Sequence, residues 1–231
     1  MNTSRLREEQ LKLAEKVMTI DQFEQARYIA GCDQAYKDNN KIISVVVVMD
    51  SKTQKIVDRA ESEQFCRTPY LSGYLFYREA PSVIEAFSKL NVKPDVLLVD
   101  ANGILHPRRI GMASQLGLAL DVPTIGIAKS LAFGKPREGK IELDKEIVAE
   151  EVITKEFANP LYVSPGHKVS LRTSIDIVKS LIMHPHKLPE PLHLAHRFAK
   201  KASKTKNKDE SSDKEKEMDS YDGFSNMNPA S

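Results

Sequence analysis

The chain has 231 residues, of which 41% are hydrophobic and 29% charged, and its formal net charge is +2. This length fits one domain with a sizeable core, and no apolar run approaches the roughly 18 residues of a membrane span. The polar N-terminus is unlike a signal peptide, and two cysteines make no disulfide framework. We therefore expect a cytoplasmic protein with no membrane partner, while the small net charge neither requires nor excludes nucleic acid.

The N-terminal part of the chain predicts one helix followed by three strands. Leucines recur at helical spacing over 5–18, which indicates an exposed amphipathic helix. Residues 28–33 have the composition of a short strand that ends at Asp33. The β-branched run at 42–49 and the stretch at 55–66 are typical of two further strands. Three strands with short connections predict a meander.

Helices and strands alternate after this meander. Residues 68–73 are expected to form a loop, and Pro81 is expected to open a helix. The remaining predicted elements are a buried strand at 95–100, a small-residue helix at 111–120, a strand at 124–129, a less regular region at 130–160, a strand and a helix within 161–183, and a short helix at 190–200. This order predicts an α/β fold with a mixed β-sheet flanked by helices.

The end of the chain differs in composition from the rest. From about residue 201 it carries charges of both signs and almost no aliphatic side chains. Such a segment cannot offset its ordering entropy by burial. We therefore expect a globular domain over 1–200 and a disordered charged tail over 201–231.

Two aspartates follow apolar runs of the predicted sheet. An unpaired carboxylate at the end of a buried strand is costly, and ligands in α/β sheets gather at the carboxyl ends of strands. If the two strands are parallel neighbours, the carboxylates of Asp33 and Asp100 lie about 5 Å apart, which suits a shared divalent cation. The alternative is that both are turn or helix caps. Three basic side chains follow Asp100 closely and suit phosphate contacts: His106, Arg108 and Arg109.

Several other polar side chains have two interpretations. Glu79 is either a third carboxylate of the site or part of a solvated ion pair with Arg78. Lys129 ends a predicted strand and is either a phosphate ligand or an ordinary surface lysine. His193 and His196, three residues apart on a predicted helix, are either a metal pair or exposed histidines, and the second interpretation is favoured.

Six motifs taken together are far more specific than any of these residues alone. They are IAGCD (29–33), PYLSGYLFYRE (69–79), LLVDANGILHPRRIGMAS (97–114), DVPTIGIAKS (121–130), LYVSPGHKVSL (161–171) and LPEPLHLAH (188–196). In their order and spacing the chain resembles the endonuclease V family over about residues 10–199. The resemblance implies a ribonuclease H-like fold and makes 1–200 the catalytic domain.

The resemblance also implies roles for particular residues of this sequence. Asp33 and Asp100 would coordinate Mg²⁺, for which Mn²⁺ can substitute, and Glu79 would complete the acidic cluster. His196 would position or activate the attacking water. Lys129 matches a catalytic position near the scissile phosphate. These five residues form the implied catalytic set.

The implied substrate contacts surround this set. Tyr70 matches the wedge that enters a duplex beside the lesion, and His106 matches a position near the scissile phosphate. A pocket for hypoxanthine would be lined by Gly73, Leu75, Ala101, Gly111 and Met112. The chain departs from the family pattern at Ala101, where Gly is frequent, and at Ser72, where Pro is frequent. We expect these departures to affect rate and substrate preference rather than metal binding.

The resemblance points to one function first, although the sequence does not separate DNA from RNA as the substrate. The first is a metal-dependent endonuclease that recognises deoxyinosine in DNA and hydrolyses a phosphodiester bond on its 3′ side, for DNA repair. The alternatives are an endoribonuclease that cleaves inosine-containing RNA and a catalytically idle inosine-binding module. The acidic residues Asp33, Glu79 and Asp100 argue against an idle module, because binding alone has no need of costly clustered carboxylates. We expect nucleic acid as the partner and a monomeric protein.

Overall fold

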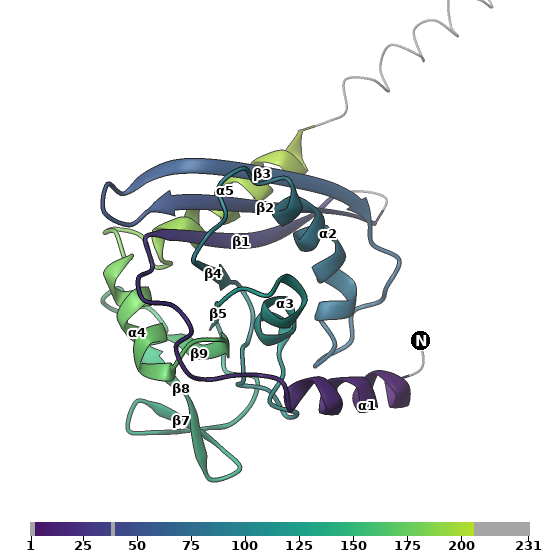
Figure 1. Ribbon diagram of the computed structural model, residues 1–231, viewed down its shortest axis with the longest axis vertical. Coiled ribbons are helices and arrows are strands. Elements are labelled where there is room, and N and C mark those ends of the chain that lie inside the picture. Colours follow the sequence, from purple (N-terminus) through teal and green to yellow (C-terminus); the bar gives the residue numbers. More distant parts are fainter. Residues whose placement is uncertain (1–2, 38–39, 206–231) are drawn as a thin grey trace, which may run out of the picture.

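The computed structural model describes residues 3–37 and 40–205. Its centre is a nine-stranded mixed sheet in the order β3-β2-β1-β4-β5-β9-β8-β7-β6 (Figure 1). The strands are β1 (Tyr28–Lys37), β2 (Lys41–Asp50), β3 (Lys55–Phe65), β4 (Val96–Val99), β5 (Thr124–Ala128), β6 (Lys135–Arg137), β7 (Lys140–Leu143), β8 (Glu146–Val152) and β9 (Leu161–His167). The helices are α1 (Thr3–Ala14), α2 (Phe76–Ser88), α3 (Met112–Leu120), α4 (Leu171–Ser180) and α5 (Glu190–Lys204).

Helices cover both faces of the sheet because the central strands are apolar on both sides. Along β4, Leu97 and Val99 join a core with α2 and α3, whereas Val96 and Leu98 join a core with α4 and the start of α5. Successive strand residues point to opposite faces, so this alternation places the two pairs of helices in separate layers. The rest of α5 packs on β2.

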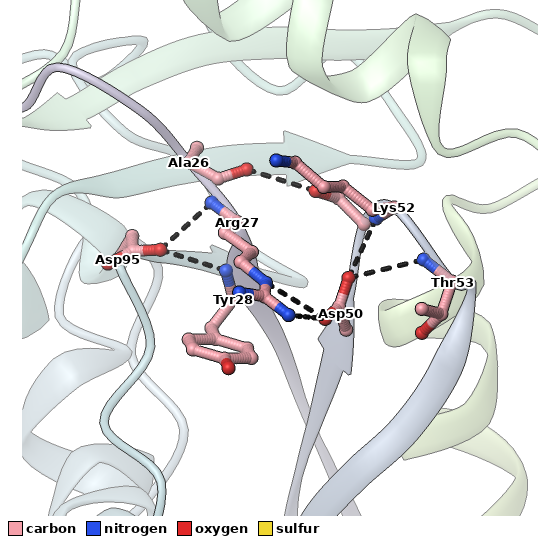
Figure 2. A network of polar contacts seen from close by, with 8 residues as sticks. Ala26, Arg27, Tyr28, Asp50, Lys52, Thr53 and Asp95 are labelled. Atoms are coloured by element: carbon pink, nitrogen blue, oxygen red, sulfur yellow. Dashed lines mark hydrogen bonds and ion pairs between the residues drawn. The ribbon is translucent and has the colours of Figure 1, made fainter.

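A partly exposed polar network fixes the start of β1 against both neighbouring strands. Asp95 Oδ2 accepts hydrogen bonds from the backbone N–H groups of Arg27 at 2.9 Å and Tyr28 at 2.8 Å (Figure 2). Asp50 Oδ2 accepts from Arg27 Nε at 2.9 Å and Nη2 at 2.8 Å. Because Asp95 precedes β4 and Asp50 ends β2, these contacts set the position of β1 relative to both.

The register that follows brings two acidic residues together. β1 pairs in parallel with β4, and the last pair is Cys32 with Val99. Asp33 directly follows Cys32, and Asp100 directly follows Val99, so the two aspartates come next to each other after this pair. The condition under which these aspartates were expected to lie close together, parallel neighbouring strands, is therefore met. The predicted mixed sheet and the meander of β1, β2 and β3 are confirmed, and the meander is antiparallel.

Several predicted boundaries were wrong. Asp33 lies inside β1 rather than at its end, because β1 keeps pairing with β2 as far as Lys37. Helix α2 begins at Phe76, one turn before Pro81, because Leu75 already has helical dihedral angles. Helix α1 ends at Ala14, and α5 continues to Lys204.

The region 130–160 is more regular than predicted. It contains β6, β7 and β8, which extend the sheet beyond β9. These strands have three, four and seven residues and are joined by tight turns with positive φ at Glu138, Gly139, Asp144 and Lys145. Strands this short contain too few alternating residues for a hydrophobic pattern to predict them.

The predicted start of the tail at 201 was wrong, because 201–204 form the last turn of α5. From residue 206 onward the predicted tail lies outside the described residues. Within 3–37 and 40–205, no helix has both the length and the apolar character needed to cross a membrane.

Candidate active site

Three carboxylates lie near one another where β1, β4 and α2 meet. Asp33 directly follows the last β1 residue that pairs with β4, and Asp100 directly follows β4. Glu79 comes from the first turn of α2. Asp33 and Glu79 are 6% and 8% exposed, and the side chain of Asp100 is 14% exposed. The earlier start of α2 is what buries Glu79 at this position.

The three carboxylates influence one another electrostatically. Burial raises the pKa of Glu79, and the negative charges of Asp33 and Asp100 add to this rise. Burial and then Asp33 also raise the pKa of Asp100, against the opposing effect of Lys129. A divalent cation among like charges offsets their repulsion, and carboxylate oxygens are ligands that Mg²⁺ prefers. The residues present therefore fit a hard divalent ion.

Two of these carboxylates are held by basic side chains. His196 Nδ1 lies 2.6 Å from Asp33 Oδ2, and Lys129 forms an ion pair with Asp100. As the side chains stand, no three Asp, Glu, His or Cys residues in the described part of the chain converge closely enough to hold an ion. An ion at this cluster therefore competes with Lys129 and His196 for carboxylate oxygens. The structure brings all five implied catalytic residues to one place.

Glu79 has a support that sequence reasoning missed. The Tyr36 hydroxyl donates a hydrogen bond to Glu79 Oε1 at 2.6 Å and accepts one from Arg78 Nε at 2.8 Å. Burial raises the pKa of Tyr36, and Glu79 raises it further, so the phenol remains a donor. Arg78 also donates to the Thr68 carbonyl oxygen. The alternative of a solvated Glu79–Arg78 ion pair is wrong, because Arg78 bonds Tyr36 while Glu79 is buried.

A pocket opens beside the carboxylates, with about 470 Å³ of empty space including its mouth. The residues that the resemblance implied as the wedge, the phosphate neighbour and the base pocket all line it: Tyr70, Gly73, Leu75, Ala101, His106, Gly111 and Met112. The further lining residues, which sequence reasoning did not single out for this role, are Ser72, Asn102, Gln115, Ala132 and Phe133. Gly111 cannot carry a side chain, since a Cβ atom there would lie 2.2 Å from the Asn102 carbonyl oxygen.

The basic residues after Asp100 are used inside the protein. His106 Nε2 lies 3.0 Å from the Gly73 carbonyl oxygen, and His106 Nδ1 accepts from the Arg108 backbone N–H at 3.2 Å. Burial and then Arg108 lower the pKa of His106 to about 4, so the ring is neutral and its Nε2 carries the proton. Arg109 pairs with Glu146 at 3.0 Å. Arg108 likewise donates to Gln10 and to the Gly73 carbonyl oxygen, so both guanidinium groups have partners within the protein.

The helix histidines have separate partners. His196 contacts Asp33, whereas the ring of His193 stacks on that of His186 at a centroid distance of 3.6 Å. His186 also lies 2.7 Å from Glu190. The interpretation of His193 and His196 as a metal pair was therefore not realised. His196 instead joins the carboxylate cluster.

Comparisons with known proteins match this chain to one family over most of its described residues. A family model described as endonuclease V matches residues 11–197. The chain is 40% identical to the endonuclease V of Dictyoglomus thermophilum over 201 residues, which cover 84% of this chain and 87% of that protein. It is 37% identical to the endonuclease V of Rippkaea orientalis, with 82% and 86% of the two chains covered.

Solved structures with the same architecture carry the same name. The endonuclease V of Bacillus subtilis superposes with a TM-score of 0.79 at 29% identity, covering 86% of this chain and 91% of that one. The endonuclease V of Ciona intestinalis superposes with a TM-score of 0.78 at 28% identity, covering 87% and 97%. That structure is a complex with a 24mer DNA containing an inosine followed by a ribo-adenosine.

Proposed function

This chain belongs to the endonuclease V family, and from that premise we propose that it is a metal-dependent endonuclease specific for deoxyinosine, acting in DNA repair. It hydrolyses a phosphodiester bond on the 3′ side of the lesion. One observation carries the proposal. Two buried carboxylates lie beside a third, Asp100, whose side chain is 14% exposed. Ala101, directly after Asp100, lines a pocket together with the other residues for which the resemblance implied a contact with the substrate.

Asp33, Asp100 and Glu79 would hold Mg²⁺, for which Mn²⁺ can substitute. When bound, such an ion polarises a phosphoryl oxygen and lowers the pKa of a bound water. The protein's own residues orient the reactants. Tyr36 holds Glu79 in place, and His196 is positioned by Asp33 to take up a proton from the attacking water.

Recognition of the base belongs to the pocket. A base inside a duplex has to leave the stack before a protein can bind all of its edge. Tyr70 is 67% exposed at the mouth of the pocket, where its ring can fill the vacated space. Lys129, on the same edge as Asp100, contributes a positive charge for a phosphate oxygen. Tyr70 and Lys129 thus complete the proposed site, one at the base and the other at the phosphate.

Cleavage of inosine-containing RNA is a second candidate, and one observation favours it. The Ciona relative was solved with a ribonucleotide directly after the inosine. A 2′-hydroxyl at that position therefore fits a relative's binding site, and the 2′-hydroxyl is what distinguishes RNA from DNA there.

The test is a side-by-side incision assay on matched oligonucleotides. The substrates contain deoxyinosine DNA, inosine RNA, deoxyinosine followed by one ribonucleotide, or an ordinary purine, each with Mg²⁺, Mn²⁺ or a chelator. We expect cutting 3′ to deoxyinosine only with metal. Asp33→Asn and Asp100→Asn should each abolish incision while leaving inosine binding largely intact. Normal turnover by either variant in Mg²⁺ would remove the metal-ligand assignment, and a strong preference for RNA would promote the second candidate.

We further propose a monomer located in the cytoplasm. The fold of a single chain brings the five proposed catalytic residues together, which supports a monomer. Both cysteines, Cys32 and Cys66, are buried free thiols, which fits a reducing compartment.

A further inference from the structure

Helix α1 is attached to the rest of the molecule in an unusual way. A surface helix normally docks through an apolar stripe. The one buried residue of α1 is a glutamine, Gln10, which is 0% exposed, whereas its neighbour Leu11 is 45% exposed. A buried amide is tolerated when its polar atoms are bonded, so its partners show what this helix is held against.

Both ends of the Gln10 amide have partners. Its Nε2 donates to the Gly73 carbonyl oxygen at 3.1 Å, and its Oε1 accepts from Arg108 Nε at 2.6 Å. Arg108 Nη2 donates to the same Gly73 oxygen at 2.8 Å. The Arg108 guanidinium also lies 4.5 Å from the centroid of the Tyr74 ring. Gln10, Arg108 and Gly73 thus form a closed triangle of hydrogen bonds.

Gly73 is part of the pocket wall, and its geometry depends on this triangle. Its φ of +79° is one that other residues rarely adopt. A Cβ atom there would lie 3.0 Å from Arg108 Nη2 and 3.3 Å from His106 Nε2. The Gly73 oxygen faces donors from three residues, so its place is tightly determined. The flanking residues Tyr70 and Leu75 line the same pocket.

We propose that Gln10 is a positioning residue for substrate recognition, which sets the pocket wall at Gly73 through Arg108 and makes α1 part of the recognition apparatus. The inference rests on the proposed function, since it concerns the pocket for the damaged base. Gln10 makes no hydrogen bond to Asp33, Glu79, Asp100, Lys129 or His196 among the described residues. Its loss should therefore weaken selection of inosine and leave the chemical step unchanged.

Two variants separate the contacts. Gln10→Met keeps the shape of the side chain and removes both hydrogen bonds. Gln10→Glu keeps an acceptor for Arg108 and removes the donor to Gly73. Leu11→Ala, on the exposed side of the same helix, is the control. Single-turnover incision is measured against enzyme concentration for inosine and matched undamaged DNA, together with the melting temperature of each protein.

For Gln10→Met we expect the half-saturating concentration for inosine DNA to rise about tenfold, because both hydrogen bonds that position the pocket wall are lost. Gln10→Glu should show a smaller rise. Both should cut undamaged DNA relatively more than the unaltered protein does, while the saturating rate stays within about twofold. Leu11→Ala should change neither quantity.

Unchanged half-saturation and unchanged discrimination in both Gln10 variants, or an equal loss in Leu11→Ala, would overturn the inference. A fall confined to the saturating rate would overturn it as well. If Gln10→Met does not fold, as its melting curve would show, Gln10→Glu decides the outcome. The unaltered protein serves as the reference: if it shows no preference for inosine, the proposed function itself fails, whereas a normal preference shared by both variants removes only the role of Gln10.

Discussion

At the scale of single residues, two histidines of the site differ in what surrounds them, and this difference indicates what each one does. His196 and His106 both follow from the sequence as site residues, but their surroundings differ. His196 has a side chain that is 43% exposed and bonds a carboxylate, so it is placed to exchange protons with solvent or substrate. His106 is 3% exposed and uses both ring nitrogens on the backbone of its own loop and of Gly73. We therefore infer a chemical role for the first and a supporting role for the second.

The chemical role of His196 leads to a prediction. His196→Ala removes both ring nitrogens, and His196→Asn keeps a donor near the place of Nδ1, so that the contact with Asp33 survives. If the other nitrogen, Nε2, moves a proton, both variants should lower the single-turnover rate by about 10²–10⁴-fold with little change in affinity. Near-normal activity of His196→Asn would show instead that the histidine acts only by holding Asp33.

The supporting role of His106 predicts a pH dependence of stability. Its folded-state pKa of about 4 lies below the ordinary value of 6.5, so the unfolded chain binds the proton more tightly. The stabilisation is fully present above about pH 6.5 and is lost as the pH falls towards 4, with a total of about 3 kcal/mol.

Urea unfolding at pH 7 and pH 4.5 tests this. The unaltered protein should lose more free energy of unfolding between these pH values than His106→Gln does, by about 2 kcal/mol. The comparison with the variant cancels the carboxylates and other histidines that titrate in both proteins. Equal losses would show that His106 is already charged in the folded protein.

At the scale of elements, the loop between β3 and α2 is hydrogen-bonded near its start, at Cys66 and Thr68, and exposed further along, at Tyr70. The Thr68 carbonyl is bonded by Arg78, and the Cys66 thiol donates to the carbonyl oxygens of Thr68 and Arg78 at 3.7 Å each. Helix α2 begins early enough to bury Glu79 in its first turn. Tyr70 projects from the tip of this loop, so the wedge and the acidic cluster are held by one segment.

Tyr70→Ala should harm incision of deoxyinosine in duplex DNA more than in single-stranded DNA. The ring offsets stacking lost when a base leaves the duplex, worth on the order of 1–3 kcal/mol per base, and a single strand has less stacking to lose. Single-turnover rates on both substrates measure the ratio. Phe157→Ala, which removes a fully exposed aromatic ring outside the pocket, is the matched control. Equal loss on both substrates would make Tyr70 a simple pocket wall.

At the scale of the whole molecule, one sheet connects the strands beside the acidic cluster with the short strands at its far edge. Its centre, β1 and β4, carries the aspartates, while α5 returns from the C-terminal part of the chain to place His196 beside Asp33. Strands β6, β7 and β8 extend the far edge, and Arg109 ties the loop after Asp100 to them through Glu146 and the Leu143 carbonyl. Helix α5 is thus part of the site through His196.

The charged segment after α5 gives a prediction at the same scale. Its sequence has too little apolar content to pack, so removing it should leave the melting temperature and incision rate nearly unchanged. The cut belongs after Thr205, because an earlier one at 204 would remove the last residue of α5 and its cap. A drop of several degrees in the melting temperature on deletion of 206–231 would show that the segment docks on the core.

The sequence by itself determined the family, the mixed sheet and the residues that gather at the site. Strand runs such as 42–49 follow from local composition, which is information that a short window contains. That Asp33 and Asp100 follow parallel neighbouring strands was a condition that the structure supplied. The family motifs placed Tyr70, His106 and the pocket residues correctly around one cavity, because each motif carries its own local geometry.

Only the tertiary structure decided how these residues are held. The Tyr36 contact with Glu79 spans 43 residues, that of Arg108 with Gln10 spans 98, and that of His196 with Asp33 spans 163. No local pattern encodes such pairs, since they depend on which helix returns to which face of the sheet. For the same reason the sequence did not show that Arg108 bonds Gln10 and Gly73, or that Arg109 pairs with Glu146. The partner of a guanidinium group depends on which parts of the chain fold against it.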